Sequence, residues 1–158
     1  MALVLPVRAD PLAELRRLTA SGQSTQALDV ADKALQSRPK DPELRFLRGV
    51  VLTDLGRSAE AMGVFEALSL EYPELPDPLN NLAVLHAARD ELDRARHLLE
   101  TALRAEPRHR AARENLGDVY VRLAIRQWQT LAGESPLEPA LARKLALARD
   151  LAGLPRAR

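Results

Sequence analysis

Residues 76–109 read PDPLNNLAVLHAARDELDRARHLLETALRAEPRH, and this stretch decides the fold. The segments that begin at Arg8, Pro42 and Arg110 align with it without a gap, because the four starting positions follow one another at intervals of 34 residues. A self-similar period of this length is typical of a solenoid of stacked helical units. Such units bury their apolar faces against their neighbours and present surfaces to other molecules.

The first three units carry alanine, a turn residue and a proline at the same places, and position eight is small in every unit except the first, where it is Leu15. Small residues are needed where two helices approach closely, and a residue in the left-handed conformation ends a helix by satisfying its last carbonyls. A proline stops the helix before it, because it offers no amide hydrogen and disfavours helix in the preceding residue. Each of the first three units is therefore predicted to be a helix-turn-helix. The residues are Leu15, Gly49, Ala83 and Gly117 at position eight, Ala27, Ala61 and Ala95 at position twenty, Gly22, Gly56 and Asp90 at the turn, Ala31, Phe65 and Leu99 at position twenty-four, and Pro39, Pro73 and Pro107 at position thirty-two.

These residues resemble the tetratricopeptide repeat (TPR) family, whose 34-residue helix-turn-helix unit has small residues at positions eight and twenty and proline at thirty-two. The resemblance covers roughly residues 8–124 and implies an all-α, right-handed TPR solenoid that occupies residues 10–132. Its units start near residues 8, 42, 76 and 110, and the last of them is incomplete.

The repeat pattern of the fourth unit is lost after Ala124. Apolar residues nevertheless keep a near-helical spacing, which predicts one long helix from about Arg110 to Ala132, ended by Gly133. Ser135-Pro136 is a typical helix start. Residues 133–154 are therefore predicted to form a C-terminal capping helix, because the end of a solenoid needs a polar outer face.

Composition excludes several classes of function. The 158 residues are 46% hydrophobic but only 3% aromatic, so we expect one domain with a core of Leu, Ala and Val. A net charge of +1 gives no general attraction to nucleic acid, and no partner of that class is expected. No apolar stretch approaches the roughly 20 residues needed to span a bilayer, so membrane insertion is not expected.

No chemical motif for catalysis is found. The chain has no cysteine, and the spacing of His86, His97 and His109 matches no metal-binding motif. Nucleophile elbows and glycine-rich phosphate loops are also missing. We therefore expect no catalytic residue, no metal and no cofactor, and we expect that the protein is not an enzyme. His86 falls at position eleven and is predicted to lie in the core, whereas exposure is expected for the other two histidines.

The resemblance implies that the first helices of successive units line a concave groove, with positions five, nine, twelve and thirteen projecting into it. Phe46 stands out there, because an exposed aromatic side chain can anchor a partner. The alternative is that Phe46 packs against the neighbouring first helix, and the sequence leaves both open. The predicted groove residues are Leu12, Arg16, Phe46, Val50, Thr53, Asp54, Asn80, Val84, Ala87, Glu114, Asp118, Val121 and Arg122.

These features favour a protein-interaction scaffold that binds a peptide or helix of another protein in its groove. The clamp with which some family members hold a peptide C-terminus is not expected, because its lysine at position five and arginine at position six are missing. Asn81 and Asn115 are predicted instead to bond backbone or partner amides. The alternative function is a self-assembling homo-oligomer without a peptide ligand, since residues 54–77 are rich in acidic side chains and residues 104–113 in arginine.

Residues 1–9 allow two interpretations. Ala2-Leu3-Val4-Leu5 resembles the end of a secretory signal peptide, although the positive region that would precede it is absent. The alternative is a short lead-in to the first helix. Residues 75–85 and 114–120 also resemble small exported TPR proteins of Gram-negative bacteria. This resemblance implies a periplasmic location, with a cytoplasmic one as the alternative.

Overall fold

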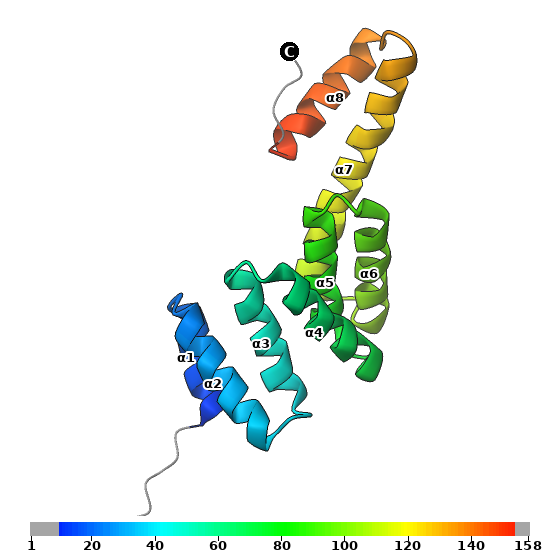
Figure 1. Ribbon diagram of the computed structural model, residues 1–158. Coiled ribbons are helices and arrows are strands. Elements are labelled where there is room, and N and C mark those ends of the chain that lie inside the picture. The colour runs from blue at the N-terminus through cyan, green and yellow to red at the C-terminus, as the bar shows by residue number, and fades with distance from the viewer. Residues whose placement is uncertain (1–9, 154–158) are drawn as a thin grey trace, which may run out of the picture. The chain divides into compact units, whose positions relative to one another are not determined.

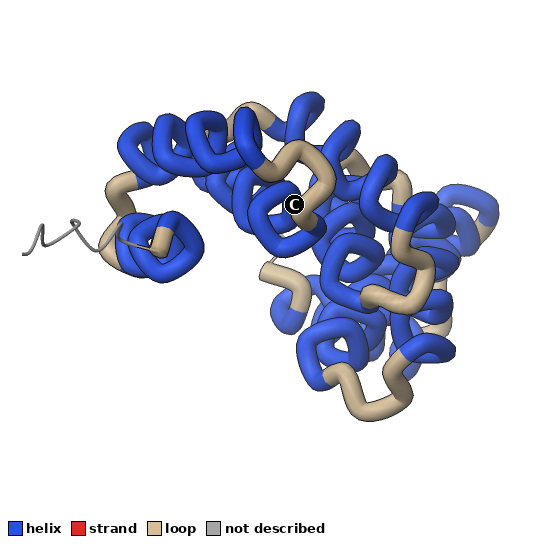
Figure 2. Tube along the Cα trace, turned by 90° about the horizontal axis from the view of Figure 1, so that it is seen from below, coloured by secondary structure: helices blue, strands red, loops and turns tan. Residues whose placement is uncertain are grey.

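The computed structural model describes residues 10–153, and the part of the chain that it describes is built of helices joined by short loops, with no strand (Figures 1 and 2). The all-α prediction is confirmed. The helices are α1 (Pro11–Ala20), α2 (Ser24–Ser37), α3 (Pro42–Asp54), α4 (Ser58–Glu71), α5 (Pro76–Ala88), α6 (Leu92–Ala105), α7 (Arg110–Glu134) and α8 (Pro139–Leu151). They form two compact units, each larger than one repeat. The first unit ends at Pro73, and the second unit begins at Glu74.

The first unit holds two helix pairs, α1 with α2 and α3 with α4. Aspartates begin both pairs: the Asp10 carboxylate accepts from the Leu12 amide, and that of Asp41 from the amides of Glu43 and Leu44. A proline follows each aspartate at the first helical position, where its missing amide hydrogen costs nothing. An ion pair between Arg16 and Glu43 links α1 to α3.

The second unit holds the pair α5 and α6, then the long helix α7 and finally α8. A core cluster of this unit joins α5, α6 and the first half of α7. At 1.5 Å per residue the 25 residues of α7 span roughly 38 Å, so its second half extends beyond the pair. Figure 1 shows α8 running back beside that second half. The buried residues of the cluster are Leu79, Ala83, Leu92, Ala95, Leu99, Ala102, Ala112 and Val119.

The ends of the helices repeat as the sequence predicts. The turns carry left-handed residues, with φ of 71° at Gly22 and Gly56 and 62° at Asp90. The second helices end just before the repeat prolines: the backbone amides of Arg38, Tyr72 and Glu106 each close the last turn of their helix. The repeat unit is therefore set by turn and cap chemistry as well as by its apolar pattern.

Position eight differs between the repeats in what surrounds it. A Cβ atom placed on Gly49 would lie 2.6 Å from the Phe65 ring, so α3 and α4 pack here at a distance that only glycine allows. Within the described part of the chain, no atom other than the neighbouring backbone of α7 lies within 4 Å of a Cβ placed on Gly117. The reason is that α7 continues as one helix, so no second helix of its own repeat folds back over this position.

The C-terminal prediction is partly wrong in its boundaries. One long helix does begin at Arg110, but it continues through Gly133 to Glu134. It ends because Ser135 is extended, the conformation favoured before a proline such as Pro136. The last helix begins at Pro139 instead of at Ser135-Pro136. The predicted lead-in, residues 1–9, and position 154 of the predicted cap lie outside the described residues.

Candidate functional site

Polar contacts fix α7 to the helix pair that precedes it in the chain. The His109 ring is the first of them: its Nδ1 accepts from the Ala112 amide, and its Nε2 lies 3.0 Å from Asp77 Oδ1. Because Nδ1 accepts a hydrogen bond, Nε2 carries the hydrogen and donates it to the carboxylate. His109 therefore caps α7 and ties it to the first turn of α5, which corrects the expectation of a simply exposed loop histidine.

Two asparagines connect the middle of α5 to α7. Asn115 Nδ2 donates to Asn80 Oδ1 at 2.8 Å, and Asn80 is buried. The prediction that Asn80 projects into an open groove is therefore wrong, because its side chain is used between the two helices. Asn81 donates to the backbone carbonyl of Asp77, as predicted, whereas the bond of Asn115 to a side chain differs from the prediction of a backbone or partner amide.

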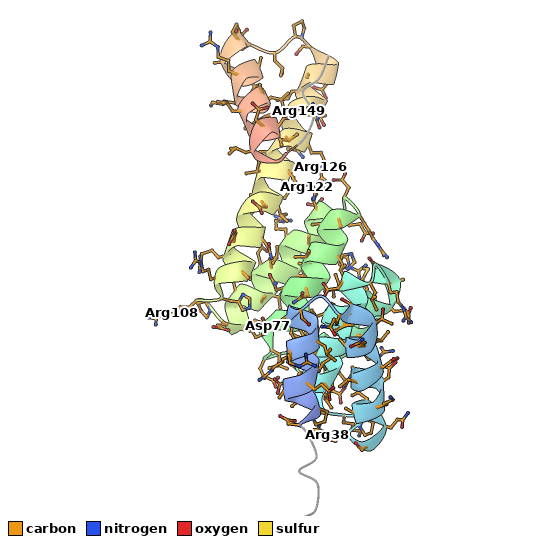
Figure 3. All side chains as sticks on the ribbon, turned by 90° about the vertical axis from the view of Figure 1, so that its left-hand side faces the viewer. Arg38, Asp77, Arg108, Arg122, Arg126 and Arg149 are labelled. Atoms are coloured by element: carbon orange, nitrogen blue, oxygen red, sulfur yellow. The ribbon has the colours of Figure 1, made fainter. Side chains whose placement is uncertain are left out.

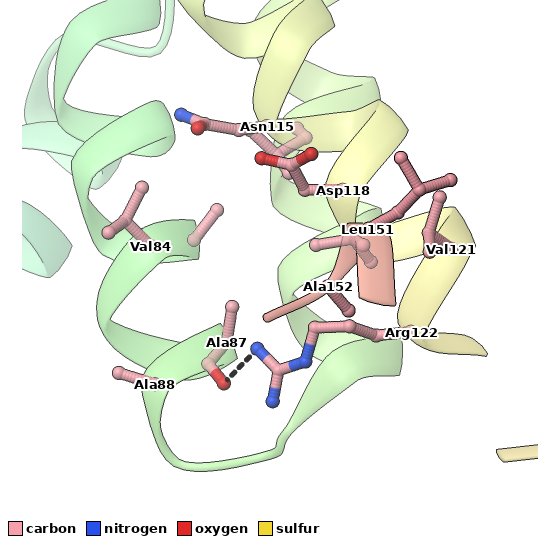
Figure 4. Close-up of a pocket in the computed structure, with 12 residues that line it drawn as sticks. Val84, Ala87, Ala88, Asn115, Asp118, Val121, Arg122, Leu151 and Ala152 are labelled. Atoms are coloured by element: carbon pink, nitrogen blue, oxygen red, sulfur yellow. Dashed lines mark hydrogen bonds between the residues drawn. The ribbon is translucent and has the colours of Figure 1, made fainter. Parts of the chain in front are cut away.

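Arg122 connects α7 to the end of α5. Its Nη1 donates to the Ala87 carbonyl at 2.8 Å (Figure 4). Its Nη2 donates to Asp90 Oδ1 at 2.9 Å. Carbonyls at the end of a helix lack partners within the helix, and a guanidinium can satisfy them. The arginine thus serves the helix end and the ion pair together.

Arg126 and Asp93 form the next link, between α7 and the first turn of α6. Arg126 Nη2 lies 2.5 Å from Asp93 Oδ2, and this hydrogen bond holds the pKa of the Asp93 carboxyl below its ordinary value. Figure 3 shows Arg122 and Arg126 at successive turns of α7.

We expect Arg126→Gln to raise the Asp93 pKa toward the ordinary value of about 3.9. Since the folded-state pKa is lowered, the stabilisation by this pair is present above the unfolded pKa and is lost as the pH falls through the folded one. An NMR titration of the Asp93 side chain measures the midpoint. Arg96→Gln is the control, because Arg96 lies farther away, at 3.8 Å, and is the smaller cause. An unchanged midpoint in Arg126→Gln would contradict the assignment.

These contacts frame a cavity of about 460 Å³ in the second unit, between the inner faces of α5 and α7 (Figure 4). This volume is within the roughly 300–1,000 Å³ of typical ligand pockets. Its wall is apolar over much of its extent, with a polar edge on α7. The lining residues are Ala83, Val84, Ala87, Ala88, Leu99, Asn115, Asp118, Val119, Val121, Arg122, Leu151 and Ala152.

The structure brings together most of the predicted groove residues of the third and fourth repeats. Val84 and Ala87 line the cavity from α5, and Asp118, Val121 and Arg122 line it from α7. Glu114 is exposed one turn before Asp118 and does not belong to the lining.

The predicted groove residues of the first two repeats have mostly local roles. Phe46 is half-buried, and its ring lies against Phe65 of the same helix pair, with 5.8 Å between centroids. Arg16 pairs with Glu43, and the Thr53 hydroxyl donates to the Gly49 carbonyl. Leu12 and Val50 are half-buried, and Asp54 is exposed. The two cavities described in the first unit are lined by other residues.

The contribution of α8 was not predicted from the sequence: the end of this helix places Leu151 and Ala152 at the cavity. A short loop makes α8 return antiparallel along α7. Thirteen residues of helix cover about 20 Å, so the end of α8 reaches back to the level of Val121. The length of the predicted last helix and the short loop before it were the signals that could have found this contact.

The remaining histidines have the predicted exposures. His86 is buried, and its Nδ1 lies 2.6 Å from Glu91 Oε2, whereas His97 is exposed.

Within residues 10–153, no group of three or more His, Asp or Glu side chains is placed to hold a metal ion. None of the helices described there combines the length and the hydropathy needed to span a bilayer.

The family described as "Psidin, N-terminal TPR repeats region" matches residues 16–133, and the chain belongs to this tetratricopeptide repeat family. A curated relative from Pseudomonas putida, the probable biofilm formation methyltransferase WspC, is 33% identical over 117 residues. The match covers 65% of this chain and 27% of that protein, so the chain spans about a quarter of the length of this relative.

Solved TPR structures share the fold. A thermophilic TPR protein from Thermus thermophilus is 24% identical, with a TM-score of 0.69, and the match covers 90% of this chain and 81% of that one. The second TPR domain of human RPAP3, in complex with the HSP70 peptide SGPTIEEVD, is 14% identical with a TM-score of 0.63. That match covers 70% of this chain and 92% of the human domain.

Proposed function

We propose that this protein is an interaction scaffold that binds a segment of a partner protein in the cavity between α5 and α7. The observation that carries the proposal is the cavity itself: apolar side chains of two successive first helices face it, and asparagine and carboxylate groups lie at its edge. Such a surface suits an extended or helical segment, which places apolar side chains against the wall and polar groups at the rim.

Two further observations support this proposal. TPR arrays in general present surfaces to partners, and the human RPAP3 domain binds a peptide.

The relative named as a methyltransferase matches this chain over only 27% of its own length, so its name supports no catalytic proposal for this chain. The periplasmic location stays a prediction.

The test uses Val84→Asp as the cavity variant. Val84 is 43% exposed, so the change is compatible with folding, but it places a charge on the apolar wall. Leu70→Asp is the matched control, because Leu70 is an 86% exposed leucine of α4 that does not line this cavity. A partner is captured from lysate with the wild-type chain and identified by mass spectrometry, and its binding segment is then titrated calorimetrically against each variant.

We expect Val84→Asp to weaken binding by about tenfold or more, since an unpaired charge is desolvated against the ligand. The Leu70→Asp affinity should equal that of the wild type. Equal affinity in both variants would show that the partner binds elsewhere. If only copies of the chain itself are recovered, in equal amounts with both variants, the self-assembling alternative replaces the scaffold.

A further inference from the structure

The charges at the cavity are not balanced. Of the described residues that line it, only Asp118 and Arg122 are charged. The Arg122 guanidinium is used within the protein, because it bonds the Ala87 carbonyl with one nitrogen and Asp90 with another. It also forms an ion pair with that aspartate, so its charge is already compensated. Arg122 is therefore a positioning residue that holds α7 against the end of α5.

Asp118 has the opposite status. Its side chain is exposed at the cavity, and within the described part of the chain no hydrogen bond or ion pair to its carboxylate is found. Figure 4 shows the carboxylate on the α7 side of the cavity, between Asn115 and Leu151. A ligand that covers Asp118 would remove water from it, and an unpaired carboxylate removed from water is costly.

Asn115 adds a second polar group beside this carboxylate. One of its amide hydrogens is used by Asn80, which leaves its carbonyl oxygen and its other amide hydrogen for a ligand. These two groups match the donor and acceptor of a peptide backbone. Apolar contacts remain available at Val84 on α5 and at Val121 on α7, which lie on opposite sides of the cavity (Figure 4).

We propose that the cavity selects a peptide segment that carries a lysine or arginine, with Asp118 accepting the positive group and apolar neighbours of that residue packed on Val84 and Val121. This inference rests on the proposed function and gives the ligand its chemistry. The predicted ligand is basic, whereas the peptide in the human RPAP3 complex, SGPTIEEVD, is acidic: three of its last four residues are acidic. An acidic side chain at this cavity would meet the free carboxylate of Asp118.

The experiment selects peptides from a random phage-displayed library on the immobilised full chain, and then measures the enriched peptides by fluorescence anisotropy. Three variants are compared with the wild type. Asp118→Asn removes the charge and keeps the shape, and Val84→Asp disables the apolar wall. Glu114→Gln is the matched control, since Glu114 is an exposed carboxylate on the same helix that does not line the cavity.

We expect the enriched peptides to carry a lysine or arginine and to bind Asp118→Asn about tenfold more weakly than the wild type, the loss of one charge-assisted hydrogen bond. Changing that basic residue of the peptide to glutamine should weaken binding to the wild type equally. It should have little effect on binding to Asp118→Asn, whereas Glu114→Gln should behave like the wild type. The peptide SGPTIEEVD is the acidic probe and should not bind measurably.

Other outcomes separate the two proposals. Peptides that depend on Val84 but show no enrichment of basic residues, or that bind Asp118→Asn with unchanged affinity, would overturn the charge selection and leave the binding cavity in place. Equal losses in Asp118→Asn and Glu114→Gln would also overturn it, by showing only a general attraction to acidic groups. Peptides that bind the wild type and Val84→Asp equally, or no enrichment at all, would overturn the proposed function itself.

Discussion

Phe65→Ala is expected to destabilise the first unit by about 3–5 kcal/mol. The ring is fully buried at 0% exposure, it fills the space left by Gly49, and it stacks at a tilt against Phe46. Truncation to alanine removes the transfer free energy of the ring and leaves a cavity that neighbouring helices can only partly close.

Urea unfolding followed by circular dichroism measures the loss in the free energy of unfolding. Hydrogen exchange shows which helices lose protection. We expect the amides of α3 and α4 to lose protection, whereas those of α6, in the second unit, keep theirs. Leu70→Ala is the control: it removes an apolar side chain from the same helix, but from a position that is 86% exposed. A change below about 1 kcal/mol in Phe65→Ala would show that the helix pair does not depend on this ring.

The repeat period explains why so much of the fold could be predicted. Helices begin at Pro42, Pro76 and Arg110, where the 34-residue period places the starts of the second, third and fourth repeats. At position twenty-four, Phe65 and Leu99 are buried as the pattern of large and small residues indicates. A residue type that recurs at one place in successive repeats indicates that the backbone conformation or the packing requires it there. Such requirements can be recognised in a single sequence.

The site could be predicted less completely, because it depends on departures from the repeat. Position five projects into the groove in the family, yet Asn80 is buried through its bond with Asn115. Arg122 was identified by its position, but its partners Ala87 and Asp90 can be found only once α7 is placed against α5. Hydrogen bonds between side chains one repeat apart depend on rotamers, which a periodic pattern does not specify.

The last helix shows the same limit from another direction. The sequence predicts that a helix caps the array, and the structure places the end of that helix at the cavity through Leu151 and Ala152. Only Ala148 of this helix is buried, whereas Leu147 is 64% exposed. A helix with so narrow a buried face gives a weak apolar signal, so its packing partner follows from loop length and geometry instead of from its pattern.

Gly49→Ala is expected to destabilise the first unit by about 1–3 kcal/mol, although alanine is the better helix former. The added Cβ would lie 2.6 Å from Cε1 of Phe65, and because this ring is fully buried, its neighbours must shift to make room. Gly117→Ala is a matched control at the same repeat position. Its Cβ meets no described atom within 4 Å other than the neighbouring backbone of α7, so we expect stabilisation by about 0.5–1 kcal/mol from helix propensity alone.

The comparison is made by urea unfolding of the two variants, and the double variant Gly49→Ala, Phe65→Leu isolates the contact. If the clash is the cause, the smaller side chain at position 65 makes room for the Cβ, and the added cost of Gly49→Ala falls in that background. A stabilising effect of Gly49→Ala in the wild type would contradict the close approach of α3 and α4. Opposite signs at the two glycines would show that the second repeat requires glycine at position eight because Phe65 packs over it, and that the continuous helix α7 removes this requirement in the fourth repeat.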